Sequence, residues 1–478
     1  MRSLAIPQKA PGPSLLATLG CMSAFRSDPL AFLRDMHARY GDVVRLPLGL
    51  QVVSVLHPDA VRHVLVDNHR NYEKGQDYER LEVVLGKGLL TSNGAIWKRH
   101  RRLAQPAFHK QRLAGFAQVM LERTQQRIEM WRDQAAGAPG RELVVDLHAE
   151  MMALTLQIVG ECLFSTDLSA VTHEIGLSLG EVLRLSNEYV SALVPLPLWI
   201  PTPFSRRFRS GLATLDAAVK RLIGARLRAE DAAHAQDAAA GPGSDLLGML
   251  LAAHLHPDAA PAAENGAEPG VVALSVQELR DEVMTLLLAG HETTANALTF
   301  GFLLLTENPA AAAALLRESA RVLGDRIPGL EDLPALAYNK QVIEETLRLY
   351  PPAWAIGRRA LAEDRIGGHA VAAGTHVLLA PMLTQRDPRF FPEPLRFVPE
   401  RFAKKESAAR PAGAYFPFAA GPRQCIGLGF AMMELQLILP TLLRSVEITA
   451  LEPDALRLEP LITLRPADGL RCRIRFRS

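Results

Sequence analysis

The chain has 478 residues, and its 53 Lys and Arg residues against 51 Asp and Glu residues give a formal net charge of +2. Apolar residues make up 48% of the chain, which provides for a large buried core and excludes a disordered polyelectrolyte. The near-neutral charge argues against a protein that binds nucleic acid through bulk charge, so no nucleic-acid partner is expected.

Length alone favours about three domains of roughly 150 residues each. The longest apolar stretch near the start, 15–19, falls far short of the ~20 residues that span a bilayer, and no secretion signal is recognisable. We therefore expect residues 1–29 to be an extension without a membrane anchor. The cysteines lie far apart with no CxxC pair, which indicates reduced thiols and a cytoplasmic protein. They are Cys21, Cys162, Cys425 and Cys472.

In chain order, the first predicted elements are two short β-rich runs, 41–46 and 51–55, that form a hairpin. Helical periodicity follows over 94–134, 143–164 and 211–230. The sequence therefore predicts one early strand pair followed mostly by helix.

The segment 229–270 is rich in Ala, Pro, Gly and Asp, so it is either an interdomain linker or a set of surface connections between helices. A helical turn or two at 245–251 favours surface connections. A long, largely apolar helix is predicted from Leu274 to Asn308, interrupted only by Gly290 and Gly301. Beyond residue 350 the chain changes to Pro-rich loops and short strands, and no repeat of fixed period is present.

The densest motif surrounds a single cysteine. A helical stretch at 428–437 follows the run Phe418-Ala-Ala-Gly421-Pro-Arg423-Gln-Cys425-Ile-Gly427. A lone cysteine is usually a small buried hydrophobic residue, but this one lies between two glycines that allow tight turns. It also lies at a helix N-terminus, where the dipole favours thiolate over thiol. A thiolate can ligate haem iron, and Arg423 is placed to meet a haem propionate.

This run resembles the cysteine loop of the cytochrome P-450 family, FxxGxRxCxG, and matches it at every fixed position. The resemblance runs from about residue 30 to the C-terminus, and it implies one large domain at 30–478 in place of three. The implied fold is mainly α with small β-sheets. The resemblance further implies haem b (iron protoporphyrin IX) between the long distal helix and the cysteine-loop helix. Cys425 is then the axial iron ligand, with Phe418 and Arg423 against the cofactor.

Two further motifs extend the resemblance. Glu345-Thr-Leu-Arg348 is similar to the family's ExxR, whose two charged residues share one helix face, and Pro399-Glu-Arg401-Phe is similar to its PERF segment. In the family, these side chains form a buried charge network behind the haem loop. The resemblance assigns that structural role to Glu345, Arg348 and Arg401, because losing one partner strands a buried charge.

Further arginines are implied as propionate ligands. Trp97-Lys-Arg-His-Arg101 matches the family's WxxxR, whose Trp and Arg hydrogen-bond a haem propionate. Arg358 lies ten residues beyond Arg348, where relatives place another propionate ligand, and Arg359 is a competing candidate. Several arginines around a dianionic cofactor make electrostatic sense.

The long helix carries a polar run that requires an explanation, Ala289-Gly290-His291-Glu292-Thr293-Thr294. Gly290 allows a ligand to approach the backbone, and Thr293 can divert a hydrogen bond and bend the helix. The run resembles the family's AGxET(T/S). That resemblance implies that Thr293 and Glu292 support bound dioxygen and bring in protons. A helix kink without chemistry is the alternative, and Thr294 can be a packing residue only.

Three apolar segments correspond to the family's haem-covering walls, and any of them can instead be ordinary core. An apolar pocket favours a lipophilic substrate held by shape. The candidate pocket residues are Ala289, Leu90, Ala353, Trp354, Ile356, Leu461 and Ile462. The stretch Pro195–Pro203 is either a lid loop between two helices or inert packing.

The Trp97 helix has a basic outer face formed by Lys98, Arg99, Arg102, Lys110 and Arg112. The face serves either solvation or the docking of an acidic electron donor, as in family members. Since only 53 residues follow Cys425, we expect electrons from a separate ferredoxin or flavodoxin with its NAD(P)H-dependent reductase. The enzyme itself is expected to be a monomer.

The sequence thus predicts a haem-thiolate monooxygenase that inserts one atom of O2 into a lipophilic small molecule by hydroxylation or epoxidation. A peroxygenase or a haem-dependent isomerase would not need the pair Glu292 and Thr293. A haem-binding sensor would show no turnover, and an all-helical scaffold would bind no haem. Fatty acids, terpenoids, steroids and polyketides all fit such a pocket.

Overall fold

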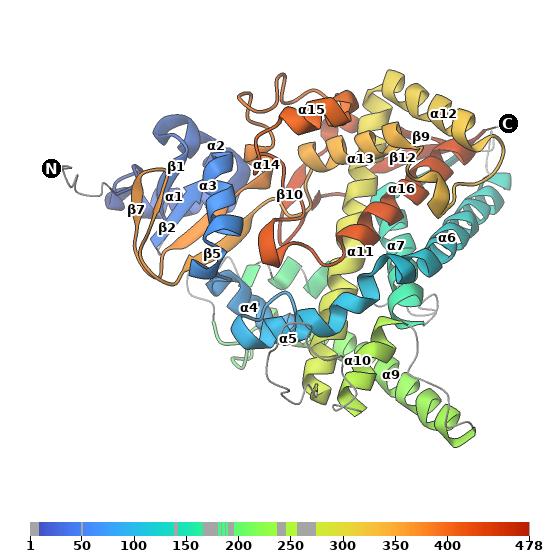
Figure 1. Ribbon diagram of the computed structural model, residues 1–478, viewed down its shortest axis with the longest axis horizontal. Coiled ribbons are helices and arrows are strands. Elements are labelled where there is room, and N and C mark those ends of the chain that lie inside the picture. The colour runs from blue at the N-terminus through green and yellow to red at the C-terminus, as the bar shows by residue number, and fades with distance from the viewer. Residues whose placement is uncertain are drawn as a thin grey trace.

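The computed structural model places a β-rich part at one end of the molecule and a larger helical part at the other (Figure 1). It describes residues 9–48, 51–137, 142–165, 180–182, 184–186, 188–189, 196–236, 245–255 and 274–477. The helices in chain order are α1 (Thr18–Ser27), α2 (Pro29–Tyr40), α3 (Pro58–Arg62), α4 (Gln76–Leu85), α5 (Gly94–Ala104), α6 (Lys110–Ala136), α7 (Leu147–Phe164), α9 (Pro203–Gln236), α10 (Leu246–Leu255), α11 (Val276–Glu307), α12 (Pro309–Leu323), α13 (Ala337–Leu349), α14 (Pro381–Thr384), α15 (Lys404–Ala409) and α16 (Leu428–Ser445).

The strands form small sheets, the largest of which has five strands in the order β1-β2-β8-β5-β3. A three-stranded sheet, β4-β12-β9, joins the middle of the chain to its end, and two further pairs are β6-β7 and β10-β11. The strands are β1 (Val43–Pro47), β2 (Gln51–Val55), β3 (Tyr72–Glu73), β4 (Glu142–Asp146), β5 (Ile356–Ala360), β6 (Asp364–Ile366), β7 (His369–Val371), β8 (His376–Leu379), β9 (Val446–Ala450), β10 (Leu458–Pro460), β11 (Leu464–Pro466) and β12 (Arg471–Phe476).

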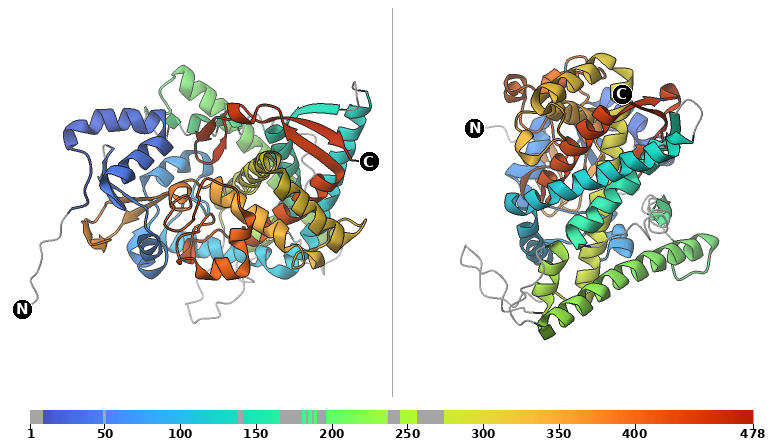
Figure 2. Two further views of the ribbon diagram at one scale, coloured as in Figure 1. Left: turned by 90° about the horizontal axis from the view of Figure 1, so that it is seen from above. Right: turned by 90° about the vertical axis from the view of Figure 1, so that its right-hand side faces the viewer.

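Helix α11 runs through the middle of the helical part (Figure 1). Its start is fixed by a capping box, in which the Ser275 hydroxyl accepts from the Glu278 backbone N–H and the Glu278 carboxylate accepts from the Ser275 N–H. Helix α7 packs along it, and α13 and α16 pack against other faces. Figure 2 shows α6 and α16 running side by side across the helical end. Since neighbours surround α11, its side chains are buried around almost the whole circumference.

Within the described residues, α7 is long and apolar enough to cross a membrane, as is the pair α11–α12 if its 110° bend is ignored. Most of the α7 window is buried inside the fold, against α11 and α6. Core helices of globular domains pass the same test, so the apolar character of α7 has an internal explanation.

The fold class predicted from the sequence is confirmed: one mainly helical domain with small sheets. The hairpin and the long helix are also confirmed, as β1–β2 and as α11. The helix predicted over 94–134 is wrong as a single element, because a 3₁₀ turn at Gln105–Phe108 that contains Pro106 separates α5 from α6. The helix predicted over 143–164 begins later, since 142–146 is strand β4.

Other predicted segments lie partly outside the described residues. Of 229–270, the structure describes the end of α9 and the helix α10, which contains the predicted turns at 245–251. The helix predicted over 211–230 is longer in the structure, as α9. Pro195, at the start of the predicted lid loop, is outside the described residues, as are residues 1–8 of the predicted extension. The rest of that extension contains α1, whose Phe25 ring packs edge-on against Phe32 of α2.

Candidate active site

Helix α11 has one accessible face. Between residues 279 and 305, all of which the structure describes, only Ala289, Gly290 and Thr293 are not buried. These residues are spaced i, i+1 and i+4, so they lie on one side of the helix. The Thr293 hydroxyl donates to the Ala289 carbonyl at 2.9 Å. Three residues of the predicted polar run therefore form the open face of α11, whereas His291, Glu292 and Thr294 are buried.

The structure gives Gly290 a different role from the one expected. A Cβ built at Gly290 would lie 3.0 Å from Cγ2 of Val159 on α7. The glycine therefore allows α7 to pack tightly against α11, and its missing side chain points to this helix pair.

The cysteine loop precedes α16 and is held by its own backbone. The Cys425 N–H donates to the Phe418 carbonyl at 3.0 Å. Gly421 has φ +68°, and a Cβ there would lie 2.0 Å from the Leu65 carbonyl oxygen, so only glycine fits. Gly427 has an ordinary φ of −84°, so the second predicted tight turn does not require glycine.

The Cys425 side chain is accessible although protein atoms surround it on most sides. Burial raises the pKa of its thiol, whereas the Gly427 N–H, Arg101 and Lys74 act in the opposite direction. Burial therefore opposes the effect of the helix N-terminus, whose Gly427 N–H favours the thiolate. A metal ion bound to the sulfur would itself displace the proton.

Four cations gather beside this loop. Arg101 donates to the Gln424 carbonyl at 2.7 Å, and Arg423 donates to the Ser92 carbonyl at 2.9 Å. The Arg423 guanidinium also lies 3.9 Å from the centre of the Trp97 ring. Arg358 is 4% exposed, and Lys74, which is 7% exposed, donates from Nζ to the Leu90 carbonyl.

Among the described residues, no carboxylate forms an ion pair with any of these four cations. Burial and the neighbouring Arg358 lower the pKa of Arg423 to about 10. Burial, Arg358 and Arg423 together hold the pKa of Lys74 well below its usual range. The nearby Asp77 offers little compensation, because burial raises the pKa of its carboxyl. A dianionic group such as the two propionates of haem would supply the missing negative charge, so these residues fit haem.

Sequence reasoning did not single out Lys74 for this group. It lies in the connection between β3 and α4, and nothing in its local sequence marks it as different from a surface lysine. Lys74 comes close to Arg358 and Arg423 only in the folded chain, because both are hundreds of residues away in the sequence.

The ExxR and PERF residues come together in one buried network. Arg348 donates to Glu345 through Nε at 2.6 Å and Nη2 at 2.8 Å, and both side chains are fully buried. Arg401 donates from Nε to the same carboxylate at 3.1 Å. Arg348 also donates to the carbonyls of Gln385 and Pro394, at 2.8 and 2.7 Å. The network therefore holds the loop after α14 against α13.

Glu292 points away from the accessible face of α11. Its Oε1 accepts from the Thr463 hydroxyl at 2.8 Å, and only 2% of the residue is exposed. Burial raises the pKa of the Glu292 carboxyl, although the Thr463 hydrogen bond and Arg465 oppose the rise. Nothing in the local sequence marks Thr463 as a partner of Glu292, since the two residues are 171 positions apart in the chain.

The predicted wall segments around 353–356 and 461–462 meet in the structure. The Trp354 indole N–H donates to the Leu461 carbonyl at 2.7 Å, and the Leu464 N–H donates to the Pro352 carbonyl at 2.8 Å. Leu90, Ala353, Leu461 and Ile462 are partly accessible. By contrast, Trp354 lies in the main core, and Ile356 lies in the core of the five-stranded sheet.

The basic face of α5 is smaller than predicted. Lys98 and Arg102 of α5 are exposed, as is Arg112, which lies on α6, and the side chain of the predicted Lys110 is outside the described residues. Arg99, in contrast, pairs with Glu278 at the start of α11. Arg99 is therefore a link between two helices and does not belong to the outer face.

The chain is similar to known proteins over most of its length. Residues 10–468 match the family model described as Cytochrome P450, which we write cytochrome P-450. The chain is 37% identical to cyclooctatin synthase of Streptomyces melanosporofaciens over 90% of this chain and 87% of that protein. It is 34% identical, with the same coverage, to cyclooctat-9-en-7-ol 5-monooxygenase of the same organism. It is 30% identical to pentalenene oxygenase of Streptomyces avermitilis over 98% of this chain and 97% of that protein. With a family match over nearly its whole length, the chain belongs to the cytochrome P-450 family.

Proposed function

We propose that this chain, a haem-dependent monooxygenase, inserts one oxygen atom of O2 into a C–H or C=C bond of a terpene-like small molecule. For a hydroxylation, the substrate RH, O2, two electrons and two protons give ROH and water. The names of two relatives support this substrate class, since one is a cyclooctat-9-en-7-ol 5-monooxygenase and the other a pentalenene oxygenase. The partly accessible apolar residues Leu90, Ala353 and Ile462 support a pocket that binds by shape.

The observation that carries the proposal is the accessible Cys425 beside four cations, of which Lys74 and Arg358 are buried and Arg101 and Arg423 are partly buried. Cys425 would ligate the haem iron, and Phe418 and Gly290 would lie against the cofactor. The propionates would be held by Arg101, Arg358, Arg423, the Trp97 indole and Lys74. When bound, haem supplies the iron that activates dioxygen and transfers the oxygen atom.

The chain's own residues hold and move the protons. The Thr293 hydroxyl hydrogen is committed to the Ala289 carbonyl, so its oxygen lone pairs remain free to accept a hydrogen bond at the open face. Burial raises the pKa of the adjacent Glu292 carboxyl, which suits this residue to the role of local proton donor. We assign proton supply to this pair.

An acidic ferredoxin or flavodoxin, reduced by an NAD(P)H-dependent reductase, would dock on the basic face formed by Lys98, Arg102 and Arg112. Exposure of all three side chains supports this assignment, and opposite charge on the donor raises the rate of encounter. The four cysteines, all free thiols, support a reducing cytoplasmic location for the monomeric enzyme.

The test begins with the holoenzyme and a panel of terpene hydrocarbons and alcohols, scored by the haem spin-state shift and by product mass. With a substrate that binds, Thr293→Ala should keep the spin-state shift but form less product per NADPH oxidised, with hydrogen peroxide making up the difference. Thr293→Ser keeps the hydroxyl and should retain more of the coupling. Full coupling in Thr293→Ala contradicts the role of this hydroxyl, and a panel without any oxygenated product contradicts the substrate class.

A further inference from the structure

The acid of the Glu292–Thr293 pair is held by a residue outside α11. Glu292 Oε1 accepts from the Thr463 hydroxyl at 2.8 Å, whereas Oε2 has no hydrogen-bond partner within the described part of the chain. Because Oε1 already serves as an acceptor, a proton taken up by this carboxyl belongs on Oε2. The Thr463 contact therefore determines which oxygen carries the transferable proton.

The orientation of the Thr463 hydroxyl is itself determined by a second contact. Asn296, one turn along α11 from Glu292, donates from Nδ2 to the Thr463 oxygen at 3.3 Å. Asn296 Oδ1 in turn lies 2.9 Å from His148 Nε2, at the start of α7. Asn296 is fully buried and Thr463 is 8% exposed, so water does not compete for these groups. With its oxygen accepting from Asn296, the hydroxyl is oriented to donate to Glu292.

Thr463 belongs to the turn between β10 and β11, which also carries two candidate pocket residues. Leu461 and Ile462 are partly accessible, and the Leu461 N–H donates to the Thr463 carbonyl at 3.1 Å. The turn is fastened to the loop after α13 through Trp354 and Pro352. A substrate that presses on Leu461 or Ile462 therefore acts on the same short turn that holds Glu292.

We propose that Thr463 is a positioning residue that retains Glu292 in its off-site orientation and releases it when substrate displaces the β10–β11 turn. This inference rests on the proposed function, because it assumes that Glu292 supplies protons for oxygen insertion. Proton supply is then low without substrate, which limits the wasteful oxidation of NADPH. Thr463 acts through Glu292 and touches no reacting atom itself.

Charged groups around the site set the direction of its pH dependence. Arg465, on β11, faces both Glu292 and His148, and it pairs with Glu459 at 2.9 Å. His148 also faces Asp146 and His291. Since the Thr463 hydroxyl lowers the pKa of Glu292, losing this hydroxyl should raise that pKa further. Replacing Thr463 by Val would leave all of the charged side chains named here in place.

The experiment compares holoenzyme preparations of wild type, Thr463→Val and Thr463→Ser. The first readout needs no substrate: the infrared C=O stretch of the Glu292 carboxyl, assigned by its loss in Glu292→Gln. It should move to higher frequency in Thr463→Val, which removes the donor, and stay in place in Thr463→Ser. Thr441→Val is the matched control, because that buried hydroxyl bonds only within α16, to the Leu437 carbonyl.

The second readout is substrate-free NADPH oxidation with a ferredoxin and its reductase. It should rise about two- to tenfold in Thr463→Val, the factor expected for one hydrogen bond, and its pH profile should move to higher pH. An unmoved infrared band or unchanged oxidation in Thr463→Val overturns the proposal; if this variant does not fold, Thr463→Ala is judged by the same criteria. If wild type forms no product from pentalenene and related terpenes, the proposed substrate class is contradicted instead. The infrared band and the substrate-free NADPH oxidation still test the role of Thr463 in that case.

Discussion

Arg358 and Arg359 are neighbours on β5 with opposite environments. Arg358 is 4% exposed and faces Lys74 and Arg423, whereas the Arg359 side chain is 34% exposed and pairs with Glu73 at 2.6 Å and Glu79 at 3.2 Å. Strand alternation produces this difference, since successive side chains point to opposite faces of a sheet. Of the two, we therefore propose Arg358 as the propionate ligand.

This relationship predicts different effects of two matched substitutions. Arg358→Met should lower the haem content of the purified protein, because it removes one charge-assisted hydrogen bond to the cofactor. Arg359→Met should keep the haem and cost no more than about 1 kcal/mol of stability, the upper range for an exposed ion pair. The ratio of haem absorbance to protein absorbance measures the difference. Equal haem content in both variants would show that Arg358 is not a propionate ligand.

A second prediction concerns iron ligation. In the reduced carbon monoxide complex, the wild-type enzyme should show the red-shifted Soret band of thiolate-ligated haem. Cys425→His should move this band to the position seen with imidazole ligands, since His is a nitrogen ligand and pushes less electron density to the iron. Cys472→Ser is the control, because that cysteine is buried in the three-stranded sheet. An unchanged Soret band in Cys425→His would show that this residue is not the iron ligand.

The sequence was sufficient for those parts of the fold and site that depend on local pattern. The α11 helix was predicted from its long apolar run, and the cysteine loop was predicted from a motif with fixed spacing. Pro106 marks the break between α5 and α6, but the helical periodicity on both sides of it led to the prediction of one continuous helix. Strand β4 could not be found in this way, because its partner β12 comes from the other end of the domain.

The same distinction explains the residues that were missed or misplaced. Lys74 and Thr463 act through partners far away in the chain, and neither has a distinctive local sequence. Arg99 was assigned to the outer face because charged helix residues usually face solvent, but its partner Glu278 lies on another helix. Contacts of this kind depend on how the elements pack, and residue type or spacing does not report them.

A third prediction separates buried from exposed charge. Glu345→Ala should cost about 3–5 kcal/mol and yield protein without haem, because it leaves the fully buried Arg348 without its carboxylate. Arg396→Ala removes an exposed ion pair with Glu393 and should have little effect on stability or haem content. Thermal unfolding and haem content measure both variants. A stable, haem-loaded Glu345→Ala would contradict the structural role.

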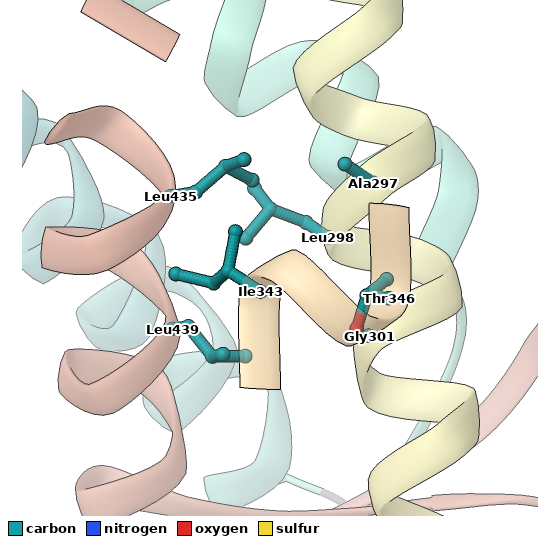
Figure 3. Close-up of a pocket in the computed structure, with 7 residues that line it drawn as sticks. All are labelled: Ala297, Leu298, Gly301, Ile343, Thr346, Leu435 and Leu439. Atoms are coloured by element: carbon teal, nitrogen blue, oxygen red, sulfur yellow. The ribbon is translucent and has the colours of Figure 1, made fainter. Parts of the chain in front are cut away.

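A fourth prediction uses the small cavity between α11, α13 and α16 shown in Figure 3. Its volume is about 10 Å³, and it is lined by Ala297, Leu298, Gly301, Ile343, Thr346, Leu435 and Leu439. A Cβ at Gly301 would lie 3.7 Å from the Thr346 hydroxyl oxygen, an ordinary contact. Gly301→Ala should stabilise the protein by roughly 1 kcal/mol, because alanine restricts the unfolded chain and favours helix.

Gly290→Ala is the matched control on the same helix. Its new methyl group would meet Val159 at 3.0 Å, so part or all of the helix-propensity gain should be lost. Denaturant unfolding with the same haem content compares the two variants. If Gly301→Ala is no more stable than Gly290→Ala, the space beside Thr346 is not available to a methyl group.

The last prediction concerns Glu434, which lies on α16 nine residues after Cys425 and is fully buried. Burial raises the pKa of its carboxyl to about 8, and the hydroxyl of Thr294 on α11 opposes part of the rise. The folded protein therefore retains a proton that the unfolded chain releases near its ordinary pKa of 4.5. Consequently the contribution of Glu434 to stability is fully present below about pH 4.5 and is lost as the pH rises to about 8.

Glu434→Gln keeps the shape of the side chain and cannot ionise, so it should remove this loss. Its stability relative to wild type should be nearly constant below about pH 4, and should improve by roughly 3–4 kcal/mol by pH 7 to 8. Thermal unfolding of the holoenzyme across this pH range is the measurement. Glu447→Gln, which removes an exposed carboxylate on the following strand β9, controls for the change in net charge and should leave the pH dependence as in wild type. Parallel curves for wild type and Glu434→Gln would show that Glu434 is ionised in the folded protein, with a partner that stabilises its charge between α11 and α16.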